Sequence, residues 1–318
     1  MVIDLTGMEV ANAGMYDGAS ALAEAALMAC RIAGRMSVTV LDTVSPTYIE
    51  VLKPYLIPQG VSIEVVSSQR LNLKPTTACL IVQQPNFYGF IEDMKALAAE
   101  ADAAGALKIV SVDPMSLGML KPPGEYGADV VTAEGQSLGV AQSFGGPYVG
   151  LFACKSKHLR QMPGRIVGQT VDSQGRTGYV LTLQTREQHI RRERATSNIC
   201  TTESLVALAT TVYMAALGKQ GMRDIANLCY HKAHYAARQI SQIKGFRLSS
   251  TAPFFREFTV SCPTSPAEIN KHLLGKAIIG GLDVSSKVPN GMLFCVTEVN
   301  TRADIDKLVK ELAIFADK

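Results

Sequence analysis

The sequence predicts an α/β fold in which helices flank a mostly parallel sheet and a smaller α+β domain follows. Over the first half of the chain, β-branched apolar runs alternate with helical patterns at a period of about 20 residues, which is typical of successive βαβ units. The composition, 47% hydrophobic and 19% charged, is that of an ordinary globular protein. A length of 318 residues can bury a large core and favours two domains.

The parallel sheet is expected in the first half of the chain. Residues 18–33 are rich in Ala, Leu and Met, and they predict a helix that is apolar nearly all round and therefore buried. Ser45 is a fair N-cap for the next helix, with Pro46 at its first position, and Gly105 ends a third. The expected strands are 37–41, 62–66, 78–83, 107–112, 129–133 and 149–154, and the two further helices are 46–55 and 91–104.

The pattern changes after Arg160. A glycine-containing stretch predicts a hairpin of residues 166–171 and 178–183. We therefore expect a large domain, residues 1–220, and then residues 221–318, which comprise a linking helix and a small C-terminal α+β domain. The expected elements after the hairpin are helices 202–217, 222–243, 266–275 and 303–315 and strands 255–261 and 293–297.

The bulk properties argue against several classes of function. The formal net charge of +3 is too small to indicate nucleic-acid or membrane binding by itself. The longest apolar stretch, Ala19–Cys30, contains Glu24 and is too short to span a bilayer. Met1–Met8 lacks the basic start and apolar run of a signal peptide.

Cysteine and histidine usage points to a reduced, metal-free protein. The 7 cysteines are odd in number and form no Cys-x-x-Cys pair, so we expect buried thiols and a cytoplasmic location rather than a disulfide framework. His231 and His234 are three residues apart on an expected helix. No nearby carboxylate or cysteine completes a metal site, so surface or packing roles are favoured.

Ligands of parallel sheets bind at the carboxyl ends of the strands. Asp17, Gly18 and Ser20 precede the buried helix, where free amides and a hydroxyl can cradle an anion; an ordinary N-cap is the alternative. Asp113 ends an apolar strand before a proline. It is either a turn residue or a carboxylate that meets the protonated ring nitrogen of a cofactor.

A run of arginines follows the expected hairpin. Arg186, Arg191, Arg192 and Arg194 alternate with acidic residues, which is the pattern of a solvated, salt-bridged turn. The glycine-rich flanks favour a functional loop instead, one that holds a phosphate, a carboxylate or an acidic partner.

Seven segments of the sequence carry motifs of one known family: Tyr16–Ala25, Val112–Gly118, Glu134–Gly139, Ser143–Tyr148, Gln184–Thr201, Ile278–Leu282 and Asn290–Leu293. They resemble subunit 1 of the glycine decarboxylase P-protein. The longest is a run of arginine, glutamate and small polar residues that follows the expected hairpin. The resemblance spans essentially the whole chain. A region of roughly a hundred residues at the family's N-terminus has no counterpart, in keeping with a chain whose first residues already read as the interior of an element.

The resemblance implies the fold of pyridoxal-phosphate enzymes of fold type I, the aspartate-aminotransferase type. It implies that pyridoxal phosphate is held covalently by a lysine of the homologous subunit 2. In this chain the equivalent position is Gln136, so no Schiff base is expected, and Lys121, Lys155 and Lys157 lie elsewhere. Asp17, Gly18, Ser20 and Asp113 would then be remnants of a cofactor site, vestigial or unoccupied.

The implied reaction is glycine cleavage. With subunit 2, the family decarboxylates glycine and transfers the aminomethyl group to the lipoyl arm of the H-protein, so the chain alone should be inactive. The flap, residues 160–194, with Arg186, Arg191, Arg192 and Arg194, is the expected contact with subunit 2 or the acidic H-protein. Two alternatives stay open: a structural or assembly subunit without a role in chemistry, and an independent pyridoxal enzyme that uses another lysine.

Overall fold

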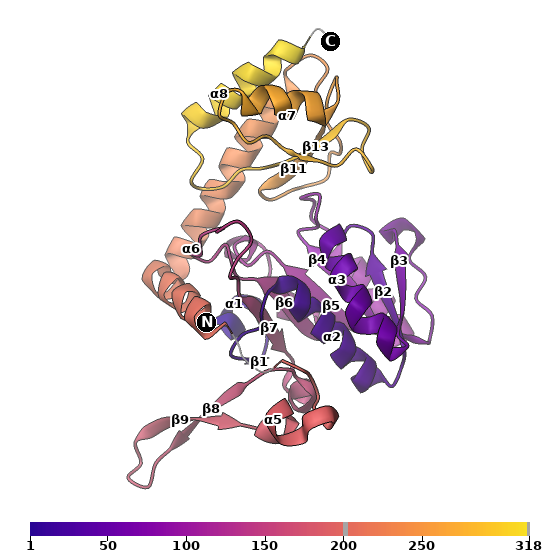
Figure 1. The fold of residues 1–318 in the computed structure, drawn as a ribbon, viewed down its shortest axis with the longest axis vertical. Coiled ribbons are helices and arrows are strands. Elements are labelled where there is room, and N and C mark those ends of the chain that lie inside the picture. The colour runs from indigo at the N-terminus through magenta and orange to yellow at the C-terminus, as the bar shows by residue number, and fades with distance from the viewer. Residues whose placement is uncertain (200–202, 317–318) are drawn as a thin grey trace. The chain divides into compact units, whose positions relative to one another are not determined.

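The computed structural model describes residues 1–199 and 203–316 (Figure 1). Cys200 and Thr201, which end the longest family motif, lie outside the described residues. The chain forms two compact units. The first comprises Met1–Gln84 and Asp93–Gly218, and the second comprises Pro85–Glu92 and Lys219–Lys318.

Within the described residues, the first unit contains a seven-stranded sheet in the order β1-β7-β6-β5-β4-β2-β3. Neighbours among β2–β6 pair in parallel, whereas β7 is antiparallel to both β6 and β1. The prediction of a mostly parallel sheet is confirmed. Its strands are β1 (Val10–Ala11), β2 (Ser37–Leu41), β3 (Ser62–Val66), β4 (Thr77–Gln84), β5 (Leu107–Val112), β6 (Val130–Glu134) and β7 (Gly150–Cys154).

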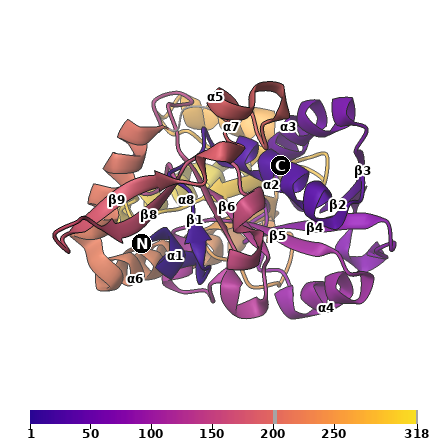
Figure 2. The same cartoon turned by 90° about the horizontal axis from the view of Figure 1, so that it is seen from below.

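Helices cover both faces of this sheet. Helices α2 (Gly18–Ala33) and α3 (Pro46–Leu56) lie on one face and α4 (Met94–Ala104) on the other (Figure 2). Helix α2 spans the predicted residues, and almost all its side chains up to Cys30 are buried, as its apolar composition requires. A short helix, α1 (Val2–Thr6), precedes β1.

Two details of the expected helices are wrong. The helix expected from Ile91 begins at Met94, because Asp93 caps it by accepting the Ala96 N–H and the Ile91 N–H donates instead to the carbonyl of Pro253. Ser45 precedes α3, but its side chain makes no capping bond. Its hydroxyl pairs with that of Thr47 at 2.9 Å.

The predicted hairpin is present and extends away from the sheet (Figure 1). It consists of β8 (Ile166–Val171) and β9 (Thr177–Thr182). Asp172 shapes the turn, since its Oδ1 accepts the N–H groups of Gln174 and Arg176 at 2.8 and 2.9 Å. A four-residue helix, α5 (Gln188–Arg191), follows the hairpin.

The second unit has its own antiparallel sheet, in the order β10-β11-β13-β12. The long helix α6 (Ser204–Ser241) leads into it and is interrupted at Gly218, where φ is 61° and ψ is −174°. Phe246, Phe258 and Phe294 lie in the core of this unit. The remaining elements are β10 (Arg247–Leu248), β11 (Glu257–Ser261), β12 (Leu282–Asp283), β13 (Gly291–Cys295), α7 (Pro266–Leu274) and α8 (Arg302–Leu312).

The loop Pro85–Glu92 joins the second unit although it leaves the end of β4. Phe90 bridges to Phe254, and Gly89 lies against Glu257 so closely that an added Cβ would be 1.9 Å from the Glu257 carbonyl oxygen. Gly89 also has a φ of 91°, which disfavours other residues. These contacts are long-range in sequence, so the local pattern does not predict them.

Candidate functional site

The carboxyl ends of the parallel strands bring together the acidic residues of the expected site. Asp113 follows β5, Glu134 ends β6, and Asp17 stands at the start of α2. The hydroxyl of Tyr48, on α3, lies among them. Burial raises the pKa of Tyr48, and the negative charges of Glu134, Asp17 and Asp113 raise it further.

Asp17 and Ser20 are engaged with each other at the start of α2. The Asp17 Oδ1 accepts the Ser20 N–H at 2.7 Å, and the Asp17 N–H donates to the Ser20 hydroxyl at 3.3 Å. This reciprocal arrangement is a capping box. Asp17 and Ser20 therefore form an N-cap, which was the alternative to an anion-binding site.

Glu134 completes this arrangement, although its sequence pattern does not mark it as a site residue. Its Oε2 accepts the N–H of Gly18 at 2.9 Å, and its Oε1 accepts the N–H of Gln136 at 3.0 Å. Burial raises the pKa of Glu134, these N–H groups oppose the rise, and the charge of Asp17 adds to it. The sequence shows Glu134 only as an acidic residue at the end of an apolar strand.

Glycines allow these segments to approach closely. A Cβ on Gly18 would lie 2.5 Å from the Tyr48 hydroxyl and 2.9 Å from the backbone nitrogen of Glu134. A Cβ on Gly135 would lie 2.8 Å from the carbonyl oxygen of Val149. Real Cβ atoms do not come this close to backbone, so neither position accepts a side chain without a shift of its neighbours.

Gln136, expected where a Schiff-base lysine would stand, is folded back onto its own loop. Its Nε2 donates to the carbonyl of Val140 at 2.5 Å. Lys155 does not replace it, because its Nζ lies 2.8 Å from Asp129 Oδ1, just before the opposite, N-terminal end of β6. Lys157 is 3.5 Å from the same oxygen.

The residues at this edge do not fit the phosphate of a pyridoxal cofactor. The N–H groups of Gly18 and Ser20, which a phosphate would need at a helix N-terminus, already donate to carboxylates. A phosphate placed there would meet the negative charges of Glu134 and Asp17. The amide of Gln136 cannot form an imine with an aldehyde.

The four arginines of the flap are not one cluster. Arg186 is 9% exposed, and its guanidinium donates to three backbone carbonyls: that of Met162, and those of Gly164 and Leu183 at 3.1 Å each. Burial lowers the pKa of Arg186. Arg191, Arg192 and Arg194 are exposed, and Arg194 lies 3.9 Å from Glu193.

An open groove of about 620 Å³ lies between α2, the end of α3 and residues 193–199. Glu24, 3% exposed, is among its lining residues, and the Glu24 Oε2 has no hydrogen-bond partner. Burial raises the pKa of Glu24, while a hydrogen bond from Ser197 and the charge of Arg31 lower it. The groove shares no lining residue with the edge that holds Glu134.

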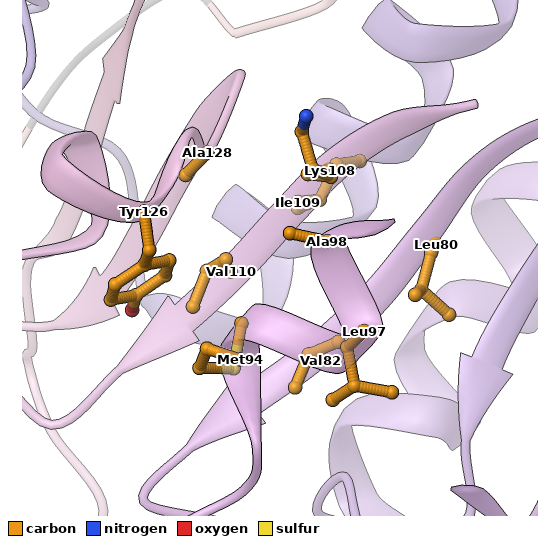
Figure 3. A pocket seen from close by; sticks show the side chains of 10 residues that line it. All are labelled: Leu80, Val82, Met94, Leu97, Ala98, Lys108, Ile109, Val110, Tyr126 and Ala128. Carbon is orange, nitrogen blue, oxygen red and sulfur yellow. The ribbon is translucent and has the colours of Figure 1, made fainter. Parts of the chain in front are cut away.

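The cavity in Figure 3 is too small for a ligand. It lies between α4 and the sheet and has a volume of about 10 Å³, which is at most the space of one water. Val82, Leu97 and Val110 are among its apolar lining residues. The hydroxyl of Tyr126 is buried without a hydrogen-bond partner, and burial raises its pKa. We interpret this cavity as a packing gap.

In residues 1–199 and 203–316, no three His, Cys, Asp or Glu side chains are grouped to hold a metal. None of the described helices is both long and apolar enough to span a bilayer. Six cysteines are free thiols within the same ranges, and Cys295 is exposed. His234 stacks on Phe254 at a centroid distance of 3.9 Å.

Known proteins of similar fold include pyridoxal-phosphate enzymes. Mouse CSAD has a TM-score of 0.70 over 99% of this chain and 74% of its own. A mutant of C-DES with glycine covalently linked to its PLP cofactor has a TM-score of 0.68 over 99% and 83%. At 15% identity, both show the fold alone, which is fold type I as predicted.

Sequence comparison identifies much nearer relatives. A protein of Thermomicrobium roseum named probable glycine dehydrogenase (decarboxylating) subunit 1 is 53% identical over 97% of this chain and 72% of its own. One of the same name from Desulforamulus reducens is 51% identical over 99% and 74%.

The family resemblance drawn from the motifs is confirmed by structure and by family. A crystal structure of glycine decarboxylase (P-protein) of the glycine cleavage system, in inhibitor-bound form, has a TM-score of 0.96 and 41% identity, over 99% of this chain and 74% of that one. The family model for the glycine cleavage system P-protein matches residues 1–312. The chain therefore belongs to the glycine cleavage system P-protein family.

Proposed function

We propose that this chain is the subunit of a P-protein that lacks the cofactor lysine and acts only with subunit 2. The pair decarboxylates glycine and transfers the aminomethyl carbon to one sulfur of the lipoyl disulfide of the H-protein, whose other sulfur is reduced. Pyridoxal phosphate is held covalently by subunit 2. The observation that carries the proposal is Gln136, an amide that is bonded to Val140 where an amine would be required.

The contacts of this chain's own residues support a dependent role. Glu134 and Asp17 engage the N–H groups of α2 that an anion would need. The names of the relatives, subunit 1 of glycine dehydrogenase, support a partner subunit 2 for this chain. What this chain contributes in the proposal is surface for the pair and, through the flap, contacts with subunit 2 or the H-protein.

A trapping experiment tests this division of labour. The purified chain is mixed with pyridoxal phosphate, reduced with borohydride and analysed by mass spectrometry, alone and together with subunit 2. We expect a pyridoxyl group on subunit 2 and none on this chain, with glycine–bicarbonate exchange in the mixture only. A pyridoxyl group at one lysine of this chain would instead support an independent pyridoxal enzyme.

Charge reversal in the flap tests its proposed role. The double variant Arg191→Glu/Arg192→Glu should raise the KM for H-protein roughly tenfold in the assembled complex, with the effect shrinking at high salt, because exposed charges act mainly on encounter. Both side chains are exposed, and the change breaks one exposed hydrogen bond, from Arg191 Nε to the Thr185 carbonyl at 3.0 Å, so the effect on folding should be small. Steady-state kinetics against H-protein concentration measure the effect.

The matched control is a charge reversal on the far side of the sheet. Lys95→Glu alters an exposed residue of α4, and it should leave the KM unchanged. Identical kinetics for the flap double variant and the wild type would remove the flap from H-protein contact. If variants of this chain never alter turnover while the pair still assembles, the alternative of a structural or assembly subunit is supported.

A further inference from the structure

The carboxylate of Glu134 occupies the anion-binding site at the N-terminus of α2. A helix N-terminus presents free N–H groups and a partial positive charge, and in parallel α/β folds it lies at the ligand-binding edge of the sheet. Here the first N–H of the 16-residue helix α2, that of Gly18, donates to Glu134 Oε2 at 2.9 Å. This site is therefore occupied by a carboxylate of the chain itself, that of Glu134.

The second oxygen of Glu134 anchors the loop that carries Gln136. Its Oε1 accepts the Gln136 N–H at 3.0 Å, so one carboxylate joins the start of α2 to the end of β6 and to the position equivalent to the lysine. Asp17 occupies a further N–H of the helix, that of Ser20, at 2.7 Å. An incoming phosphate would have to displace one carboxylate and lie beside another.

Glycines let the start of α2 and the end of β6 pack closely against their neighbours. A Cβ added to Gly18 would lie 2.9 Å from the backbone nitrogen of Glu134 and 2.5 Å from the Tyr48 hydroxyl. Gly135 is pressed against Val149 in the same way. Both glycines therefore allow the close approach that brings the Glu134 carboxylate within hydrogen-bond range of the Gly18 N–H.

We propose that Glu134 is a built-in anion that closes the start of α2 and thereby excludes the phosphate of pyridoxal phosphate from this chain. This inference rests on the proposed function, because excluding the phosphate from this chain restricts the cofactor to subunit 2. The absence of a lysine prevents covalent capture, whereas Glu134 prevents the prior, noncovalent binding. The two blocks are separate, so each can be removed separately.

The first test measures phosphate binding to the full chain. Glu134→Ala removes the carboxylate from the Gly18 N–H, and Glu134→Gln removes its charge at nearly constant size. By ³¹P NMR titration with inorganic phosphate, both variants should bind at least about tenfold more tightly than the wild type, with an affinity that falls as salt rises. Glu125→Gln removes an exposed carboxylate elsewhere and should behave as the wild type.

The second test adds the missing amine. Gln136→Lys alone should give little borohydride-trappable pyridoxal adduct, because the Glu134 carboxylate still occupies the phosphate-binding position at the start of α2. Glu134→Gln/Gln136→Lys should give at least about tenfold more at the same concentration of pyridoxal phosphate. Pyridoxal without its phosphate is the control ligand, and it should react equally with both variants.

The outcomes separate this inference from the proposed function. Unchanged phosphate affinity in folded Glu134→Gln, or equal trapping by the single and double variants, would overturn the role of Glu134 and leave the subunit assignment intact. A pyridoxyl adduct on the unmodified chain would overturn the subunit assignment. Circular dichroism checks folding; if Glu134→Ala unfolds, Glu134→Gln alone decides.

Discussion

Arg186→Ala should lower the free energy of unfolding of this chain by about 3 kcal/mol or more. The substitution removes the side-chain donor of the buried Met162 and Gly164 carbonyls, whereas the Leu183 carbonyl keeps the backbone N–H of residue 186 at 3.3 Å. Each buried acceptor left unsatisfied costs on the order of 1–3 kcal/mol. Urea unfolding followed by circular dichroism measures the loss, and the flap should become the first segment that limited proteolysis cleaves.

Two further variants test whether the buried guanidinium of Arg186 accounts for this loss of stability. Arg194→Ala removes an exposed arginine of the same flap and should change stability by no more than about 0.5 kcal/mol. Arg186→Lys keeps the charge but should recover only part of the loss, because a single ammonium does not reproduce the planar fork of the guanidinium. Equal stability of Arg186→Ala and Arg194→Ala would mean that the buried guanidinium does not hold the base of the flap.

Gly150→Ala should destabilise the first unit by about 3 kcal/mol as well. An added Cβ would lie 2.3 Å from the Asp17 carbonyl oxygen and 2.8 Å from the Met15 Cβ. Overpacking of this kind against backbone forces a shift that costs at the upper end of about 1–3 kcal/mol. The shift must separate β7 from the segment before α2, where Gly150 and Met15 exchange N–H···O bonds of 2.8 and 3.0 Å.

The control for Gly150→Ala lies in the hairpin. A Cβ on Gly178 would meet nothing within 4 Å, so Gly178→Ala should cost little and can gain from a stiffer unfolded chain. Thermal unfolding of the two variants beside the wild type measures the difference. A Tm of Gly150→Ala equal to that of Gly178→Ala would mean that the approach of α2 to β7 is looser than the structure shows.

The sequence by itself determined the elements whose pattern is local. The strands at 37–41, 62–66 and 107–112 and the helix at 18–33 have the predicted limits, because β-branched runs and an Ala/Leu-rich stretch carry their preference within a few residues. The family motifs, Gln136 among them, were also legible in the sequence. The hairpin was predicted from its glycines and turn, and differs by one residue in β9.

The tertiary structure alone decided which polar groups meet. Glu134 reaches Gly18 across 116 positions of sequence, and Arg186 lies beneath the base of the flap rather than beside the exposed Arg191. The loop 85–92 joins the second unit through Phe254 and Glu257. The physical reason is that hydrogen bonds and burial depend on distance in space, which a local pattern of residues does not encode. Only the folded chain brings these groups within bonding range.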